Sequence, residues 1–394
     1  MNKEIKKLIP DLRFPEFVNE GEWEEKELNN FCFNISSGKD KNSEVGEFEL
    51  YGSTGIIGRT ESASYNGDYI LVARVGANAG LLNRAKGKFG VTDNTLVLDL
   101  KKVDSIDFIH YSLDKIGLNK LVFGSGQPLI TGGQLKSLQL ISPQAENEQQ
   151  KIASCLSYLD EVIAGHSQKL DLLKEHKKGL MQNLFPQEGE KVPKLRFKEY
   201  VNEGVWVEKK LGDIGEPLMC KRILKEQTTT NPNDGIPFYK IGTFGRIADS
   251  YISRELYNDF KNKYSFPNIG DILISAAGTI GRLVVFDGLP AYFQDSNIVW
   301  LGNDEALVLN SFLFHYYSKI KWQTSDGGII SRLYNSDLKN MKILFPKGKI
   351  EQQKITDCLS SLDVLIIAQA EKVEQLKLHK KGLMQGLFPK VSEL

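Results

Sequence analysis

The sequence contains few of the residue types that bind metals or form cross-links. Its four cysteines stand far apart, without a Cys-x-x-Cys pair or a histidine at zinc spacing, which argues against a zinc site. They are Cys32, Cys155, Cys220 and Cys358, and we expect reduced, partly buried thiols. No run of about 18 apolar residues occurs, and the polar stretch 1–10 lacks the apolar segment of a secretion signal. We therefore expect a cytoplasmic protein without a membrane span.

The sequence also lacks net charge, because 50 basic side chains balance 50 acidic ones. A neutral chain gives no overall sign of nucleic-acid binding, so any basic surface must be local. Neutrality mildly favours association with partners. The length of 394 residues leaves room for two or three domains, and a hydrophobic content of 41% is ordinary for a folded protein.

Motifs of catalysis are missing as well. Residues 231–234 read NPND and lack the second proline and the aromatic residue that an adenine methyltransferase needs. The GSG at 124–126 is too short for a nucleotide-binding loop, and neither a P-loop nor an H-E-x-x-H motif occurs. The histidines are scattered; His176 and His379 occupy one repeated helix position, which favours a partner-facing or solvated role. No cluster of carboxylates and lysine suits a nuclease, so we expect no catalytic residue, metal or cofactor.

An internal repeat dominates what is present. Residues 10–28 match 193–211 at an offset of 183, and residues 148–186 match 351–389 at an offset of 203. The second match begins with EQQKI and ends with HKKGLMQ-x-LFP in both copies. The final GLFPKVSEL could lead back into the first lead-in, which predicts a circular arrangement of two similar halves. We predict domains at 1–143 and 191–346, a central helix with its linker at 144–190, and a C-terminal helix at 347–394.

The repeated segments predict two long helices. Apolar side chains recur at alternating spacings of four and three, which is a heptad seam, and Pro143 and Pro186 bound the first copy. The seam residues are Ile152, Leu156, Leu159, Ile163, His166, Leu170 and Leu173, and then Ile355, Leu359, Leu362, Ile366, Gln369, Val373 and Leu376. Lys177 and Lys380 are further polar positions in it. The alternative is a long helix packed on its own domain, but a seam of about five heptads, present twice, favours a coiled coil.

Two similar halves pair most simply about a two-fold axis, which makes the helices antiparallel. His166 and Gln369 lie near the middle of their helices, and the middles of an antiparallel pair meet. We therefore predict that these two side chains form a polar layer that sets the register, at some cost in stability. The alternative is that both lean out to solvent.

The variable regions, 30–140 and 213–343, indicate mixed α/β (α+β) domains. The β-branched and apolar runs Tyr69–Ala73, Thr95–Leu100, Ile272–Ser275 and Ile298–Leu301 predict strands, with glycines between them. A common skeleton recurs in three pairs of segments. They are 67–80 with 270–281, 91–98 with 293–300, and 134–143 with 337–346. The pattern predicts one fold with two different surfaces.

These features together resemble the specificity subunits of Type I restriction–modification enzymes, over essentially the whole chain. The resemblance rests on the duplicated EQQKI and HKKGLMQ-x-LFP motifs, on the IPDLRF and VPKLRF lead-ins, and on the G-D-Y/I core of the variable regions. YGSTGIIGRT at 51–60 also looks like a turn-rich recognition element of some such domains. Each motif alone is weak, whereas their duplicated order is specific.

The resemblance implies a division of labour. Each variable region would be a target recognition domain that binds one half of a split, asymmetric DNA site. The two helices would form an antiparallel spacer between the half-sites. Two methyltransferase subunits would bind the shared segments and carry S-adenosylmethionine, and restriction–translocase subunits, which use ATP and magnesium, would complete the complex. The chain itself would direct adenine methylation and restriction without catalysing either.

Side chains that contact bases are expected on loops between strands. Arginine suits guanine edges and phosphates, and asparagine and glutamine suit adenine. In the first domain we predict Ser53, Thr54, Arg59, Arg74, Asn78, Asn83, Arg84 and Gln127. In the second we predict Lys240, Thr243, Arg246, Thr279, Arg282, Ser331, Arg332 and Tyr334. Arg332 has extra support, because GGIISRLY at 327–334 aligns with GSGQPLIT at 124–131. A solvated surface role is the alternative for each of them.

Two other function classes compete with this interpretation. A single-chain methyltransferase or nuclease with its own recognition domains would need the missing motifs, and a methyl-transfer assay of the isolated chain would detect it. A DNA-binding regulator, or a coiled-coil scaffold with no DNA role, would not co-purify with a methyltransferase.

Overall fold

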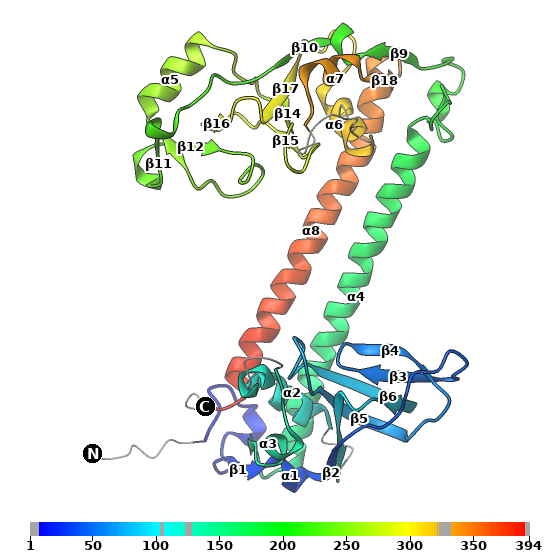
Figure 1. The fold of residues 1–394 in the computed structure, drawn as a ribbon, viewed down its shortest axis with the longest axis vertical. Helices are drawn as coiled ribbons and strands as arrows, with labels where there is room; N and C mark the ends of the chain where they lie inside the picture. The colour runs from blue at the N-terminus through cyan, green and yellow to red at the C-terminus, as the bar shows by residue number, and fades with distance from the viewer. Residues whose placement is uncertain (1–7, 103–105, 123–127, 321, 323–331, 391–394) are drawn as a thin grey trace. The chain divides into compact units, whose positions relative to one another are not determined.

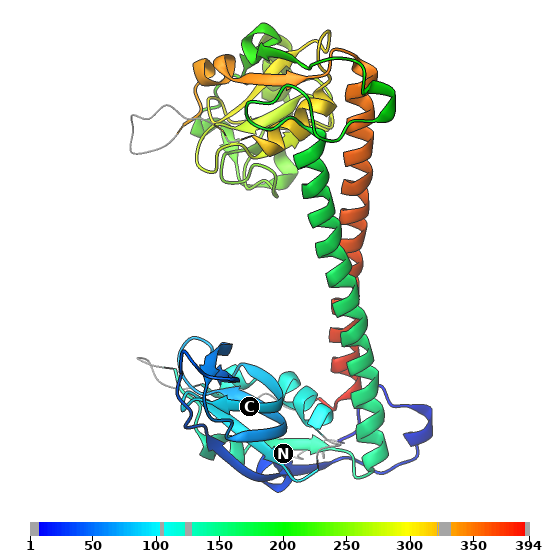
Figure 2. The same cartoon turned by 90° about the vertical axis from the view of Figure 1, so that its right-hand side faces the viewer.

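The computed structural model describes residues 8–102, 106–122, 128–320, 322 and 332–390. The chain divides into two compact units, and the division cuts both long helices. Unit 1 comprises Met1–Gln168 with Ala370–Leu394, and unit 2 comprises Lys169–Gln369. Figure 2 shows that the first (blue) and last (red) described segments of the chain both belong to unit 1.

Unit 1 is built on one six-stranded sheet. Its order is β2-β7-β5-β6-β3-β4, antiparallel throughout except for the parallel pair β3 and β6 (Figure 1). The elements are β1 (Glu24–Glu27), α1 (Leu28–Phe31), β2 (Cys32–Ser37), β3 (Phe48–Gly52), β4 (Gly55–Thr60), β5 (Tyr65–Ala73), β6 (Leu82–Val91), β7 (Thr95–Leu100), α2 (Ile106–Ile116), α3 (Gly132–Lys136) and β8 (Gln139–Ser142). Strands β1 and β8 form a separate antiparallel pair.

Unit 2 contains two four-stranded sheets, β10-β17-β14-β15 and β11-β13-β12-β16, and the antiparallel pair β9 and β18. The first sheet repeats the order β2-β7-β5-β6 of unit 1, with the same antiparallel pairings. The elements are β9 (Val207–Lys210), β10 (Gly215–Leu218), β11 (Thr228–Thr229), β12 (Ile236–Tyr239), β13 (Tyr251–Ile252), α5 (Arg254–Lys263), β14 (Ile272–Ser275), β15 (Leu283–Val285), β16 (Tyr292–Phe293), β17 (Ile298–Asn303), α6 (Asn310–Lys319), α7 (Asn335–Asn340) and β18 (Lys342–Phe345).

The predicted strands are therefore confirmed, and so is the common skeleton. The bridges Val75–Leu129 and Ala277–Arg332 confirm the alignment of 124–131 with 327–334 for its described residues, 129–131 with 332–334. The alignment of 91–98 with 293–300 is wrong by one residue within the strands, because Thr95 corresponds to Ile298. The turn before β17 is one residue longer than the turn before β7. Ser296 takes up the extra residue in a left-handed conformation, with φ of 59°.

The hydrophobic cores follow the alternation of the strands. On one face of the unit 1 sheet, Ile70 and Val72 pack with Phe108 of α2, whereas Leu71 packs with Phe89 on the opposite face. Unit 2 repeats this division, with one face of β14 toward α6 and the other toward the second sheet. Because both faces of the central strand are covered, its residues read as a continuous apolar run.

Both long helices form, as predicted. Helix α4 spans Glu146–Leu184 and helix α8 spans Lys349–Leu387 (Figure 1). In unit 1 the start of α4 packs with the end of α8, and in unit 2 the end of α4 packs with the start of α8, so the segments run antiparallel in each unit. All of the predicted seam side chains are buried or half-buried. No helix in the described part of the chain has the length and apolar character needed to cross a bilayer.

Lysines that interrupt the seam are paired across it. Lys380 Nζ donates to both carboxylate oxygens of Asp160, at 2.6 and 2.7 Å, within unit 1. Lys177 makes the equivalent ion pair with Asp363 within unit 2. The predicted contact of His166 with Gln369 would join the two units and stays a prediction; Gln369 is 9% exposed.

The circular arrangement is visible in the backbone hydrogen bonds. Leu12 N donates to Gly386 O at 2.8 Å, so the first lead-in docks on the end of the last helix. The second lead-in does the same, because Leu195 N donates to Asn183 O at 2.9 Å. Each unit thus joins one variable region to the beginning of one long helix and the end of the other.

Candidate nucleic-acid interface

Four segments meet at one end of the unit 1 sheet, and we call them loop cluster 1: residues 51–55, 74–80, 92–94 and 128–131. Backbone hydrogen bonds join them. Thr92 N donates to Tyr51 O at 3.0 Å, Arg74 N to Asn94 O at 2.8 Å, and Ile130 N to Arg74 O at 2.8 Å. Such bonds hold the loops on the strand ends, so the side chains between them have defined positions.

Loop cluster 2 is the counterpart in unit 2: residues 239–247, 276–281, 294–297 and 332–334. Three matching bonds join these segments. Gln294 N donates to Tyr239 O at 3.0 Å, Ala276 N to Asn297 O at 2.8 Å, and Leu333 N to Ala276 O at 2.9 Å. Tyr51 and Tyr239 hold equivalent positions in their domains. The segment 51–60, which resembles a recognition element, therefore begins where the turn after Tyr239 begins in unit 2.

Two glycines allow the loops after the central strands to pack closely. A Cβ at Gly80 would lie 2.5 Å from Asn119 N, and a Cβ at Gly281 would lie 2.1 Å from Trp322. Both residues also have positive φ, of 90° and 82°. Only glycine meets both requirements without strain, which explains why glycines recur after these strands.

The residues predicted to bind DNA in the first domain fall into two groups. Arg74 and Asn78 belong to loop cluster 1, as do Ser53 and Thr54, and Gln127 lies outside the described residues. Arg59 lies instead on the edge strand β4, and Asn83 and Arg84 lie on β6, an inner strand of the sheet. The position of a Cβ at Gly55 is 3.5 Å from Asn83 Oδ1, which places the β3–β4 turn beside β6.

The predicted residues of the second domain gather more closely. Arg246, Thr279 and Arg282 line one hollow of about 190 Å³, together with Ile241, Gly242, Ser275 and Gly278. Lys240 and Thr243 form the turn beside it, since Thr243 N donates to Lys240 O at 3.0 Å. Arg332 and Tyr334 also belong to loop cluster 2, and Ser331 lies outside the described residues. Tyr334 is exposed, as a base-contacting side chain would need to be.

Sequence reasoning missed a buried clamp that positions each domain on its helices. Arg13 binds both carboxylate oxygens of Glu148 at 2.8 Å, and Arg196 binds those of Glu351 at 2.8 and 2.9 Å. All four side chains are nearly inaccessible. Both members are part of the repeated blocks, so their duplication was the signal that could have identified them.

Aromatic side chains pack against the phenylalanine that ends each repeat. Phe388 packs against Trp23 and Phe108 in unit 1, at ring-centroid distances of 6.1 and 5.6 Å. In unit 2, Phe185 packs against Trp206 and Phe312 at 6.1 and 5.3 Å. The LFP motif that ends each repeat therefore places its phenylalanine in the core of the domain that it joins.

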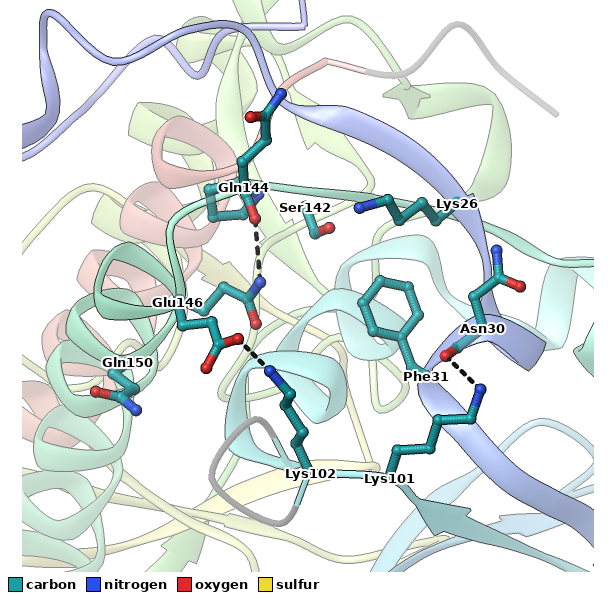
Figure 3. A pocket seen from close by; sticks show the side chains of 11 residues that line it. Lys26, Asn30, Phe31, Lys101, Lys102, Ser142, Gln144, Glu146 and Gln150 are labelled. Carbon is teal, nitrogen blue, oxygen red and sulfur yellow. Dashed lines mark hydrogen bonds and ion pairs between the residues drawn. The ribbon is translucent and has the colours of Figure 1, made fainter.

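A larger hollow, of about 490 Å³, lies at the start of α4 in unit 1 (Figure 3). Its charged side chains are already engaged: Lys102 pairs with Glu146, and Lys101 Nζ donates to Asn30 O at 3.0 Å. The lining contains one carboxylate and no histidine or cysteine, so it does not offer an acid–base pair or a metal-ligand set. Within the described part of the chain, no three His, Cys, Asp or Glu side chains group in a way that could hold a metal ion.

Comparison with known proteins agrees with this geometry. The chain matches the family described as Type I restriction modification DNA specificity domain twice, at residues 20–175 and 203–378. It is similar to a putative type I restriction enzyme specificity subunit of Haemophilus influenzae, with 38% identity over 81% of each chain.

Solved structures share the fold. A Type I restriction–modification S subunit from M. genitalium superposes with a TM-score of 0.67 at 18% identity, over 98% of this chain and 100% of that one. A chain from a study of type I R-M complex assembly superposes with a TM-score of 0.55 at 16% identity, over 93% and 97%. The family match covers both variable regions and much of both helices, and the chain therefore belongs to the Type I restriction–modification DNA specificity family, as a non-catalytic specificity subunit.

Proposed function

We propose that the chain binds a bipartite, asymmetric DNA site, with loop cluster 1 on one half-site and loop cluster 2 on the other. The observation that carries this proposal is that one strand skeleton, joined by three matching backbone bonds, displays different side chains in the two clusters. Unlike recognition surfaces on a common scaffold favour unlike half-sites. Helices α4 and α8, of 39 residues and about 58 Å each, would act as the spacer. That length exceeds the roughly 34–36 Å between successive half-sites on one face of DNA.

We further propose that two methyltransferase subunits and restriction–translocase subunits assemble with the chain in the cytoplasm. Equivalent buried clamps fix each domain on the helices in the same way, so the equivalent helix ends of the two units would present two similar docking surfaces to identical partners. S-adenosylmethionine, ATP and magnesium would be bound by those partners, and the chain itself would bind no cofactor. The chemistry that it directs would be adenine methylation at the recognised site and restriction of unmodified DNA.

The test is to produce the full chain with its methyltransferase subunits and to map methylated adenines in the host DNA. We expect one motif made of two different half-sites separated by a spacer of constant length. Methylation at a continuous site, or at a palindrome, would contradict the bipartite asymmetric assignment. The stoichiometry is measured independently, by the mass of the purified complex.

A further inference from the structure

The arginines of the predicted recognition surface differ in what their guanidinium groups already bind. In unit 1, Arg59 donates to the carbonyl oxygens of Gly46 and Glu47 at 3.0 and 2.7 Å. Arg84 donates to both carboxylate oxygens of Asp68 at 2.7 Å. A DNA contact by either side chain would have to replace these bonds, so Arg59 holds β4 to residues 46–47 and Arg84 holds β6 to β5.

The same distinction holds in unit 2. Arg282 Nη1 donates to Phe244 O at 2.8 Å and thereby links the 240–247 turn to the residue that precedes β15. Arg332 Nη2 donates to Ser296 O at 2.7 Å and supports the longer turn before β17. Both guanidinium groups are half-buried and engaged within the fold.

Arg74 is different. Its guanidinium has no hydrogen-bond or ion-pair partner within the described residues, and its Nε atom is buried without an acceptor. Its backbone is held on both sides, through Asn94 O and Ile130 N. A buried donor without an acceptor is unfavourable unless a ligand supplies one. Arg74 thus follows the end of β5 on a backbone held by hydrogen bonds, while the N–H donors of its guanidinium group have no acceptor within the described residues.

Arg246 is the counterpart in unit 2. Arg246 is exposed near the end of the 240–247 turn. Its guanidinium group, like that of Arg74, has no hydrogen-bond or ion-pair partner among the described residues. Arg246 N donates to Thr243 O at 2.9 Å, and the turn is tied down by Arg282 through Phe244. Neighbouring Lys240, by contrast, pairs with Asp249 at 2.9 Å. Arg246 therefore carries an unpaired guanidinium group on a turn that hydrogen bonds hold in place, and it lines the same hollow as Thr279.

We propose that Arg74 and Arg246 are the side chains with which the two domains bind guanine in their respective half-sites. The proposal rests on the proposed function. The planar guanidinium matches the O6 and N7 acceptors of guanine with two parallel hydrogen bonds, which requires a fixed approach. Both arginines stand on backbone held by several internal bonds, which supplies that approach. One such residue in each loop cluster assigns one guanine contact to each half-site.

The experiment substitutes each arginine by lysine in the full chain, produced with its methyltransferase subunits. Lysine keeps the charge but loses the two-point geometry, so a phosphate contact survives and a guanine contact does not. We expect Arg74→Lys to weaken binding to the intact site by roughly 5- to 150-fold and to relax one guanine position in one half-site. Arg246→Lys should do the same in the other half-site alone. Binding is measured on the cognate duplex and on duplexes with single-base changes, and methylated sites are mapped in cells.

The matched control is Arg254→Lys, at the exposed first residue of α5, which should change neither affinity nor target. The proposal is overturned if either lysine variant keeps full discrimination at every position. It is also overturned if affinity falls equally on all DNA sequences, since that is the signature of a phosphate contact. If the unsubstituted complex itself methylates no bipartite site, the proposed function fails instead, and the two failures are thus distinguished.

Discussion

Unit 1 and unit 2 share a supporting frame and differ in the elements that carry their loop clusters. Both contain the four-strand order, the buried Arg–Glu clamp and the phenylalanine of the repeated LFP motif. Unit 1 then extends its sheet with the β3–β4 hairpin, whereas unit 2 builds a second sheet with α5. The comparison teaches that the repeat preserves the attachment of each domain to the helices and leaves the rest of each domain, including the loop cluster that we propose to face DNA, free to diverge.

A smaller difference lies where each domain meets the helices. In unit 1, Tyr111 OH donates to Asp160 at 2.7 Å, on the same carboxylate that Lys380 binds. In unit 2 the equivalent position carries His315, whose Nε2 lies 3.2 Å from Ser360 Oγ. Burial lowers the pKa of His315 to about 4, with the positive charge of Lys177 as the next cause. His315 therefore makes this contact sensitive to mild acid in unit 2, whereas Tyr111 carries no group that mild acid protonates.

The largest expected effect comes from breaking the clamps. Glu148→Ala and Glu351→Ala each leave a buried arginine without its partner, which should cost about 3–5 kcal/mol of unfolding free energy. Glu148 also accepts from Trp23 Nε1 at 3.3 Å, whereas Trp206 Nε1 has no partner in the described residues, so unit 1 should lose at least as much. Denaturant unfolding with a tryptophan signal measures both. A loss below about 1 kcal/mol would show that the clamp contributes as little as an exposed ion pair.

The next effect is the pH dependence of stability that His315 contributes. His315 is neutral in the folded state down to pH of about 4, while it titrates near 6.5 when unfolded. Its contribution is therefore complete above pH 6.5 and is lost as the pH falls from 6.5 toward 4, because the unfolded state binds the proton first. The difference between the unfolded and folded pKa of His315 corresponds to about 3 kcal/mol of unfolding free energy.

His315→Gln should remove this component while keeping a group able to bond to Ser360. The comparison is the difference in unfolding free energy between the variant and the parent, measured at pH 7.5 and at pH 5. His110 in unit 1 also has a lowered pKa through burial, so it contributes in the same direction to both proteins and cancels in that difference. An equal pH dependence in variant and parent would contradict the assignment.

The smallest effect concerns the two seam ion pairs. Double-mutant cycles of Asp160 with Lys380, and of Asp363 with Lys177, should each give a coupling of about 0.5–1 kcal/mol, because the pairs are only partly buried. The unit 1 coupling should be the larger one, since Tyr111 also donates to Asp160 and restricts its motion. Thermal unfolding of the single and double variants measures both couplings. A larger coupling in unit 2 would reverse this part of the comparison.

The sequence by itself determined the periodic and repeated features. The heptad spacing predicted both long helices, because apolar residues at that spacing lie on one face of a helix. The β-branched runs predicted the central strands. Duplication of the lead-ins and helix ends also predicted the circular arrangement that Leu12 and Gly386 complete.

Only the tertiary structure decided which groups are already bonded. Nothing in the local pattern distinguishes Arg84, held by Asp68, from Arg74, whose Nε has no acceptor. The clamp partners Arg13 and Glu148 are 135 residues apart, and the seam partners Asp160 and Lys380 are 220 apart. Periodicity reports which face of an element is buried, whereas the pairing of side chains distant in sequence depends on how the elements pack. The sequence alone therefore could not show which arginines are bonded within the fold and which have a guanidinium group without a partner.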